Sequence, residues 1–215
     1  RGGFTAAAAQ RVAGAGLYDL RSLVNRSLLS CSAEGRFEMH ELLRQFAAAK
    51  LAQDSEALKA GQAAHASFYV RALAAWHAGA KGPRQADVIQ EMDVEIANAR
   101  VAWDWTVASG DLLGLSRAVD GLCTYYDWRV RWQDGLDACE AAWEYLDGLR
   151  AELGPPYTCE LVRATARGAY RLCWLGRRAS RDGLVGASGV AEAAAPAAER
   201  ALTMIEGHRG GCSTG

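Results

Sequence analysis

From Asp54 to Leu175 the chain carries apolar residues at helical spacing, interrupted only by short stretches that contain Gly or Pro. No part of this segment alternates between apolar and polar residues as a strand does. We therefore predict a mainly α chain, built from antiparallel helical hairpins in series between about Ser55 and Leu175. The residues expected to share a helix face are Leu58, Gln62, His65, Tyr69, Ala72 and Trp76; Ile96, Ala99, Trp103 and Val107; Leu112, Leu115, Val119, Leu122 and Tyr126; and Leu136, Cys139, Trp143 and Leu146.

Polar residues and glycines predict where these helices begin and end. A helix that starts at Asp54 or Ser55 is expected to stop between Gly79 and Pro83. Asp93 is expected to cap a separate helix that ends at Gly110. Asp111 is then expected to cap the next one.

The first 53 residues differ because they contain strand signals. Two short helices, the first capped by Thr5, precede one hairpin between about Leu28 and Met39, whose turn contains Gly35. A closing helix is expected from His40 to about Gln53. Two helices, a hairpin and a closing helix make a winged-helix-like unit over residues 1–53.

The junction at His40 is the candidate site. Phe37 and Met39 alternate with polar neighbours as in a half-buried strand, and helical spacing begins with Leu42. The first turn of a helix presents unpaired backbone N–H groups, and a histidine held there can add a further donor to an anion. His40 is therefore a candidate phosphate contact.

The run Met39-His40-Glu41-Leu42-Leu43-Arg44-Gln45-Phe46 resembles the MHD-type motif of the NB-ARC class of STAND signal-transduction ATPases. In that family the motif joins the wing of a winged-helix domain to its last helix, and its histidine faces the β-phosphate of ADP in the resting state. The resemblance implies the same role for His40 in the intact protein. Glu41 stands where the plant-type motif has aspartate.

Downstream, the run from Glu95 to Trp105 resembles the start of the helical-repeat region that follows this winged helix in bacterial relatives. The segment from Arg129 to Leu136 resembles part of a tetratricopeptide (TPR) repeat, and residues Tyr170 to Arg178 form a partial echo of it. We therefore expect a TPR-like region over residues 54–178 and a degenerate or flexible tail over 179–215.

Composition excludes several classes of protein. A formal charge of -1 over 215 residues argues against a chain-wide field for nucleic acid or membranes. No apolar run approaches the length of a membrane span and no signal peptide is recognisable, so we expect a soluble, cytoplasmic protein without membrane contacts. The six cysteines form no C-x-x-C pair, and we interpret them as small buried hydrophobic residues. We expect no metal site.

The sequence contains no recognisable catalytic constellation. A P-loop needs Gly-Lys followed by Ser or Thr, and none of the three lysines follows a glycine. A nucleophile elbow and a His-Glu-x-x-His pair are also missing. We expect no enzyme activity and no cofactor in this chain itself, whereas the resemblance implies ADP or ATP bound elsewhere in the parent protein.

Three functional hypotheses follow. The first is a regulatory fragment of a STAND ATPase, a signal-transduction or transcriptional regulator. Its winged helix would contact a nucleotide-binding domain of the same chain, and its helical repeats would bind an inducer or protein. The second is DNA binding by the winged helix, with Arg21 and Arg26 on the recognition helix and Arg36 on the wing. The third is a free-standing TPR-like interaction scaffold.

Overall fold

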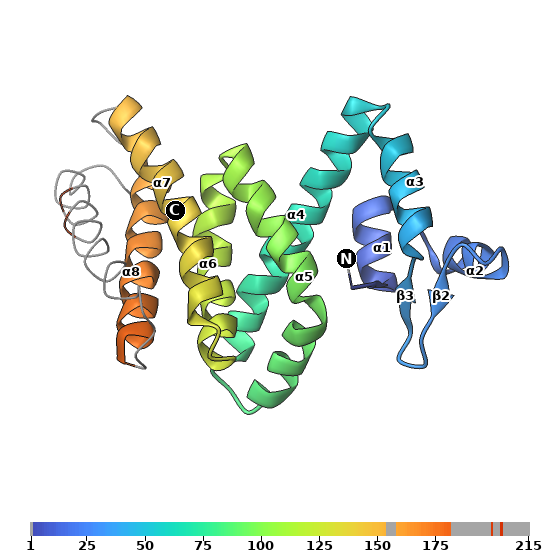
Figure 1. Cartoon of the computed structure of the whole chain (residues 1–215), viewed down its shortest axis with the longest axis horizontal. Helices are drawn as coiled ribbons and strands as arrows, with labels where there is room; N and C mark the ends of the chain where they lie inside the picture. Colours follow the sequence, from blue (N-terminus) through green and yellow to red (C-terminus); the bar gives the residue numbers. More distant parts are fainter. Residues whose placement is uncertain (1, 154–157, 182–198, 200–202, 204–215) are drawn as a thin grey trace. The chain divides into compact units, whose positions relative to one another are not determined.

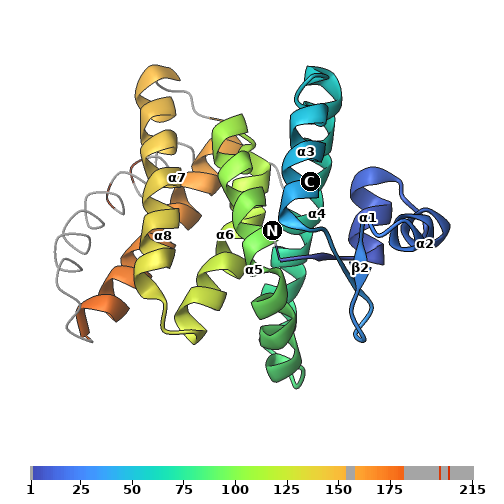
Figure 2. The ribbon, with the colours of Figure 1, turned by 45° about the vertical axis from the view of Figure 1, so that its right-hand side comes forward.

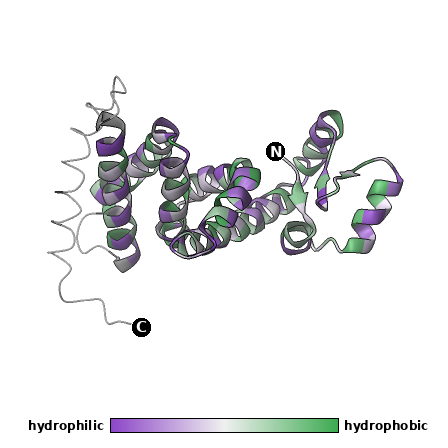
Figure 3. Ribbon diagram, turned by 90° about the horizontal axis from the view of Figure 1, so that it is seen from below, coloured by the Kyte–Doolittle hydropathy of each residue, from purple (hydrophilic) through white to green (hydrophobic). Residues whose placement is uncertain are grey.

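The computed structural model describes residues 2–153, 158–181, 199 and 203. Within this part the chain is mainly α, as predicted, with one small antiparallel sheet (Figure 1). The helices carry both hydrophobic and hydrophilic residues along their length (Figure 3). The elements are β1 (Phe4–Thr5), α1 (Ala6–Ala13), α2 (Leu17–Asn25), β2 (Ser30–Cys31), β3 (Arg36–Glu38), α3 (Glu41–Leu51), α4 (Ser55–Gly79), α5 (Gln85–Ser109), α6 (Leu112–Trp128), α7 (Trp132–Leu153) and α8 (Cys159–Arg181).

The sheet has three strands in the order β1-β3-β2. The predicted hairpin forms β2 and β3, but the prediction of a single hairpin missed β1, whose Phe4 pairs with Phe37 of β3. A strand of two residues is too short to give a periodic signal. Its pairing depends instead on the Phe4 and Phe37 rings, which stack with centroids 5.9 Å apart.

The chain divides into two compact units: residues 1–72 with 90–105, and residues 73–89 with 106–215. Helices α4 and α5 therefore contribute residues to both units. The predicted domain boundary after residue 53 concerns a different division of the chain and stays a prediction. Most of the predicted tail over 179–215 lies outside the described residues.

The first unit has a small core beneath its sheet. Leu20 of α2 and Phe37 of β3 are buried there with Ala9 and Leu29. The predicted cap of α1 is present, since the Thr5 hydroxyl accepts a hydrogen bond from the Ala8 N–H at 3.1 Å.

A buried polar network joins this sheet to α4 and α5 within the first unit. The Glu95 carboxylate accepts hydrogen bonds from Arg36 (2.5 Å), Tyr69 (2.7 Å) and Asn98 (2.9 Å). Asn98 also donates to the carbonyl of Gly3 at 2.9 Å. Glu95 is 8% exposed, so its charge is held by these partners rather than by water.

Helix α5 corrects one predicted helix start. It runs without interruption through Asp93, which therefore caps nothing, although Gly110 ends the helix in a left-handed conformation as predicted. Residues 85–109 contain no Gly or Pro, and Val88 and Met92 continue the buried face of the following residues. Nothing in this sequence breaks the helix at residue 93.

In the second unit, α6 packs against α7 and α8, and α7 packs against α8 (Figures 1 and 2). The predicted apolar faces of α6 and α7 are buried, including Leu122, Leu136 and Leu146, except that Leu112 at the start of α6 is partly exposed. Asp111 caps α6 as predicted, accepting from the Gly114 N–H at 2.9 Å. No helix in the described residues is both long enough and apolar enough to cross a membrane.

The cysteines follow the prediction only in part. Cys123 of α6 and Cys139 of α7 are buried with their Sγ atoms 3.3 Å apart. Cys31 of β2 is exposed, so the prediction of burial was wrong for this residue. Its strand lies at the edge of the sheet.

Candidate functional site

His40 lies between β3 and α3, at the predicted junction, and is exposed. It is the N-cap residue of α3, and its Nδ1 accepts a hydrogen bond from the Leu42 N–H at 3.4 Å. Because Nδ1 acts as the acceptor, the neutral ring carries its proton on Nε2. That N–H is a donor suited to an anion.

The first turn of α3 also carries an acidic side chain. The Glu41 carboxylate accepts from the guanidinium of Arg44 at 2.6 and 2.8 Å and from the Gln45 amide at 2.9 Å. These bonds hold the carboxylate along the helix toward its C-terminal side.

Helix α3 presents apolar side chains to solvent. Leu42 is 69% exposed, Phe46 is 63% exposed and Leu51 is 42% exposed. Not one residue of α3 is buried. Leu42 and Phe46 are four residues apart and therefore share a face of the helix, directly after His40.

The three arginines of the DNA-binding hypothesis differ from one another in solvent exposure. Arg21 lies on α2 and Arg26 is its C-cap residue, and both are exposed. The Arg36 side chain is mostly buried, and it donates to Glu95 and, at 3.0 Å, to the carbonyl of Gly2. Its charge is thus neutralised within the first unit, which leaves Arg21 and Arg26 as the exposed members of this set.

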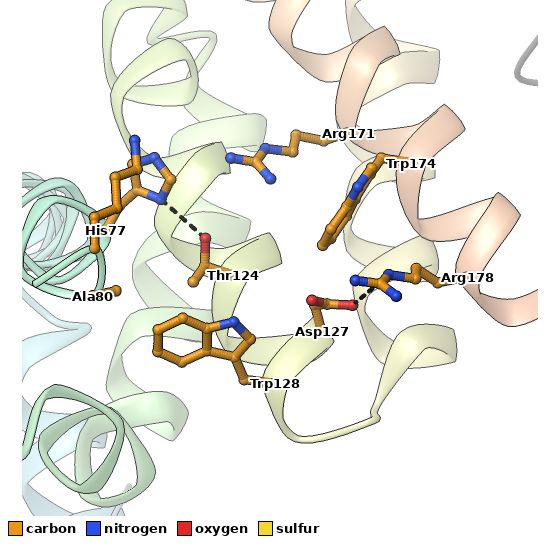
Figure 4. Close-up of a pocket in the computed structure, with 9 residues that line it drawn as sticks. His77, Ala80, Thr124, Asp127, Trp128, Arg171, Trp174 and Arg178 are labelled. Atoms are coloured by element: carbon orange, nitrogen blue, oxygen red, sulfur yellow. Dashed lines mark hydrogen bonds and ion pairs between the residues drawn. The ribbon is translucent and has the colours of Figure 1, made fainter. Parts of the chain in front are cut away.

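The second unit contains an open pocket of about 380 Å³ that the sequence did not predict (Figure 4). His77 and Lys81 come from the end of α4 and the turn after it, and the other lining residues come from α6 and α8. No local motif unites residues so far apart in sequence. The lining residues are His77, Ala80, Lys81, Thr124, Asp127, Trp128, Arg171, Trp174 and Arg178.

One wall of the pocket holds a hydrogen-bonded histidine. The Thr124 hydroxyl donates to the carbonyl of Asp120 at 2.7 Å, and His77 Nδ1 lies 2.9 Å from the same oxygen. Because the single hydroxyl proton is already committed, Nδ1 must be the donor. The neutral ring then leaves Nε2 as an acceptor that can also take up a proton.

Burial lowers the pKa of His77, and the charges of Lys81, Arg171 and Arg167 lower it further, whereas Asp120 raises it. The neutral ring is therefore favoured in the folded protein.

The opposite wall is a stack of three side chains on α8, Arg171, Trp174 and Arg178. Trp174 lies between Arg171 and Arg178, whose guanidinium carbons are 5.6 and 5.2 Å from the indole centroid. Arg171 Nε is 2.6 Å from an oxygen of Asp120, and Arg178 Nε is 3.3 Å from an oxygen of Asp127. Both carboxylates come from α6, so the pairs hold these side chains of α8 against that helix. Figure 4 shows the pair between Arg178 and Asp127.

In the part of the chain that the structure describes, no group of three or more His, Cys, Asp or Glu side chains could hold a metal ion. The chain matches no protein-family model, no curated protein and no solved structure. Function must therefore be argued from these two sites and from the sequence motif.

Proposed function

We propose that this chain is a non-catalytic regulatory fragment of a STAND ATPase, a signal-transduction or transcriptional regulator. The observation that carries the proposal is His40, an exposed N-cap residue that offers an Nε2–H donor beside the first turn of α3. In this hypothesis the donor contacts the β-phosphate of ADP bound by a nucleotide-binding domain of the parent protein.

The exposed apolar face of α3 supports the same partner. Leu42 and Phe46 lie within six residues of His40 and are more than half exposed. Exposed apolar side chains that share a helix face are typical of a surface that packs against another domain. A nucleotide-binding domain seated on this face would bring its ADP next to His40.

The second unit supports the sensor part of the proposal. A TPR-like arrangement of α6, α7 and α8 would place the pocket on a scaffold of packed helices, where an inducer or a protein partner binds. Binding there would favour one of two states of the parent protein, and His40 would stabilise the resting state.

The decisive experiment measures ADP release from the full-length protein carrying His40→Ala or His40→Asn. Asparagine caps a helix as well as histidine does, but its short side chain does not reach as far. We expect both variants to release ADP faster and to raise basal signalling. Loss of one hydrogen bond to phosphate costs the resting state about 1–3 kcal/mol, or roughly 5- to 100-fold in the population of a rare active state.

The two variants separate a phosphate contact from a simple helix cap. If His40 only caps α3, His40→Ala lowers the melting temperature, His40→Asn restores it, and neither changes ADP release. That result would refute the nucleotide-sensing role. A complete gene without a P-loop upstream of this segment would also refute it, and would favour the scaffold or DNA-binding hypotheses.

A further inference from the structure

We infer that the pocket of the second unit binds a small organic anion with a flat ring, such as an aromatic carboxylate. The inference rests on the proposed sensor role of this unit and specifies the chemical class of its ligand. Three observations support it: guanidinium donors of Arg171 that have no acceptor among the described residues, one net positive charge among the charged side chains described there, and two indole rings.

The guanidinium of Arg171 has donors to spare. Its bond to Asp120 uses Nε, and within the described residues its two terminal nitrogens have no hydrogen-bond acceptor. The side chain is only 11% exposed, and it points toward the side of the pocket where His77 lies (Figure 4). A carboxylate is the group whose two oxygens best match such a planar pair of donors.

The charges around the pocket favour an anion over a cation. The described lining holds three cationic side chains, Lys81, Arg171 and Arg178. Arg171 is paired with the carboxylate of Asp120, and the lining also holds the carboxylate of Asp127. That carboxylate is already engaged, because it accepts from the indole N–H of Trp132 at 3.1 Å and pairs with Arg178. Among the described residues one positive charge is therefore in excess and both carboxylates are already paired, so the pocket disfavours a ligand cation.

The remaining surface suits a ring. Trp128 of α6 and Trp174 of α8 are half-buried and line the same pocket (Figure 4). Indole rings bind flat apolar groups by stacking and by edge contacts. A volume of about 380 Å³ falls in the lower part of the usual range for small-molecule sites, roughly 300–1,000 Å³.

His77 adds a second donor when it is protonated. Its Nδ1 is committed to Thr124, so a proton taken up from solvent goes to Nε2. A bound carboxylate would favour this protonated form, and affinity should therefore rise as the pH falls.

The test is isothermal titration calorimetry of the 215-residue chain with indole-3-carboxylate and, separately, with its neutral isostere indole-3-carboxamide. Inorganic phosphate serves as an anion without a ring. We expect the carboxylate to bind at least about tenfold more tightly than the other two compounds, and more weakly as salt rises. Equal binding of carboxylate and carboxamide would overturn the inference.

Matched variants locate the site. Lys81→Ala and Arg178→Ala remove a cation from the lining, and Arg163→Ala removes an exposed arginine of the same helix α8 outside it. We expect the first two to weaken carboxylate binding roughly five- to tenfold and the third to leave it unchanged. Equal losses in all three would overturn the assignment.

The result can be separated from the fate of the proposed function. If the pocket binds the carboxylate but His40→Ala does not change ADP release, the ligand class stands and the STAND assignment is rejected. A normal His40 effect with no binding of any carboxylate would reject only the ligand class.

Discussion

The Nη1 atom of Arg36 lies 2.5 Å from Oε1 of Glu95, although 59 residues separate the two in sequence. This ion pair connects the strand before His40 to helix α5 within the first unit. Both side chains are at least four-fifths buried, since their exposed fractions are 16% and 11%. The pair is therefore a main contact between the sheet and the helices of this unit.

Replacing Glu95 should destabilise the first unit. Glu95→Ala leaves Arg36 without its carboxylate and Tyr69 without its acceptor, and it removes one acceptor of the Asn98 amide, so we expect a loss of about 3 kcal/mol in the free energy of unfolding. Asp104→Ala breaks an exposed pair with Arg100 on the same helix and should cost less than about 0.5 kcal/mol. Urea denaturation measures both, and equal effects would contradict a stabilising role for the buried network.

A close approach of two helices in the second unit should make Gly121 intolerant of any side chain. A Cβ at this position of α6 would overlap the carbonyl of Leu73 in α4. Gly121→Ala should therefore lower the free energy of unfolding by about 2 kcal/mol.

Gly148 provides the control for this prediction. It lies within α7, and nothing is within 4 Å of the site of its Cβ. Gly148→Ala should raise the free energy of unfolding by about 0.5–1 kcal/mol, because alanine loses less conformational entropy in a helix. Thermal unfolding of both variants would reveal whether the helices are as close as described, and a stabilising Gly121→Ala would show that they are not.

The turn between α6 and α7 contains a strained valine. Val130 has a φ of 56°, a conformation that β-branched residues rarely adopt, and it is 65% exposed. Val130→Gly should relieve this strain with little loss of packing and raise the free energy of unfolding by about 1 kcal/mol. The same change at Val101, an exposed position inside α5, should lower it by about 1 kcal/mol. Calorimetry should show a higher free energy of unfolding for Val130→Gly and a lower one for Val101→Gly. A loss of stability in both variants would contradict the prediction.

Two histidines should make stability depend on pH. Burial lowers the pKa values of His65 and His77 below their ordinary value of 6.5 in the folded state. Below pH 6.5 the unfolded chain therefore binds more protons than the folded one. The free energy of unfolding should fall with the pH until both histidines are also protonated in the folded protein.

Urea denaturation between about pH 7.5 and 5.5 measures this loss, before most carboxylates titrate. The double variant His65→Phe, His77→Asn keeps a ring beside Tyr69 and a donor beside Thr124. We expect a clearly smaller loss in this variant. The same loss as in the parent chain would assign the pH dependence to other groups.

Local patterns predicted most helix limits correctly. Thr5, Asp54 and Asp111 begin helices because their side chains accept from backbone N–H groups of the first turn, and Gly110 ends a helix because it adopts the left-handed conformation. The helical spacing on α6 and α7 predicted which residues are buried for the same reason. Asp93 shows the limit of this reasoning, since an aspartate begins a helix only where the preceding residues are not already helical.

The sequence predicted one of the two candidate sites but not the other. His40 could be found from the sequence, because a change of period over a few residues defines its junction and a short motif surrounds it. The pocket around Trp174 could not be found, since its walls come from helices that are far apart in sequence. Its arginines also look like ordinary solvent-exposed charges of an amphipathic helix.

The sequence by itself determined the mainly α class, the limits of most helices and the position of His40, because these depend on interactions among neighbouring residues. Tertiary structure alone decided that Phe4 joins the sheet and that Arg36 pairs with Glu95. It also decided that His77 faces the arginines of α8 across a pocket. Those outcomes depend on which distant surfaces meet, and a residue pattern that specifies a helix face does not specify its partner.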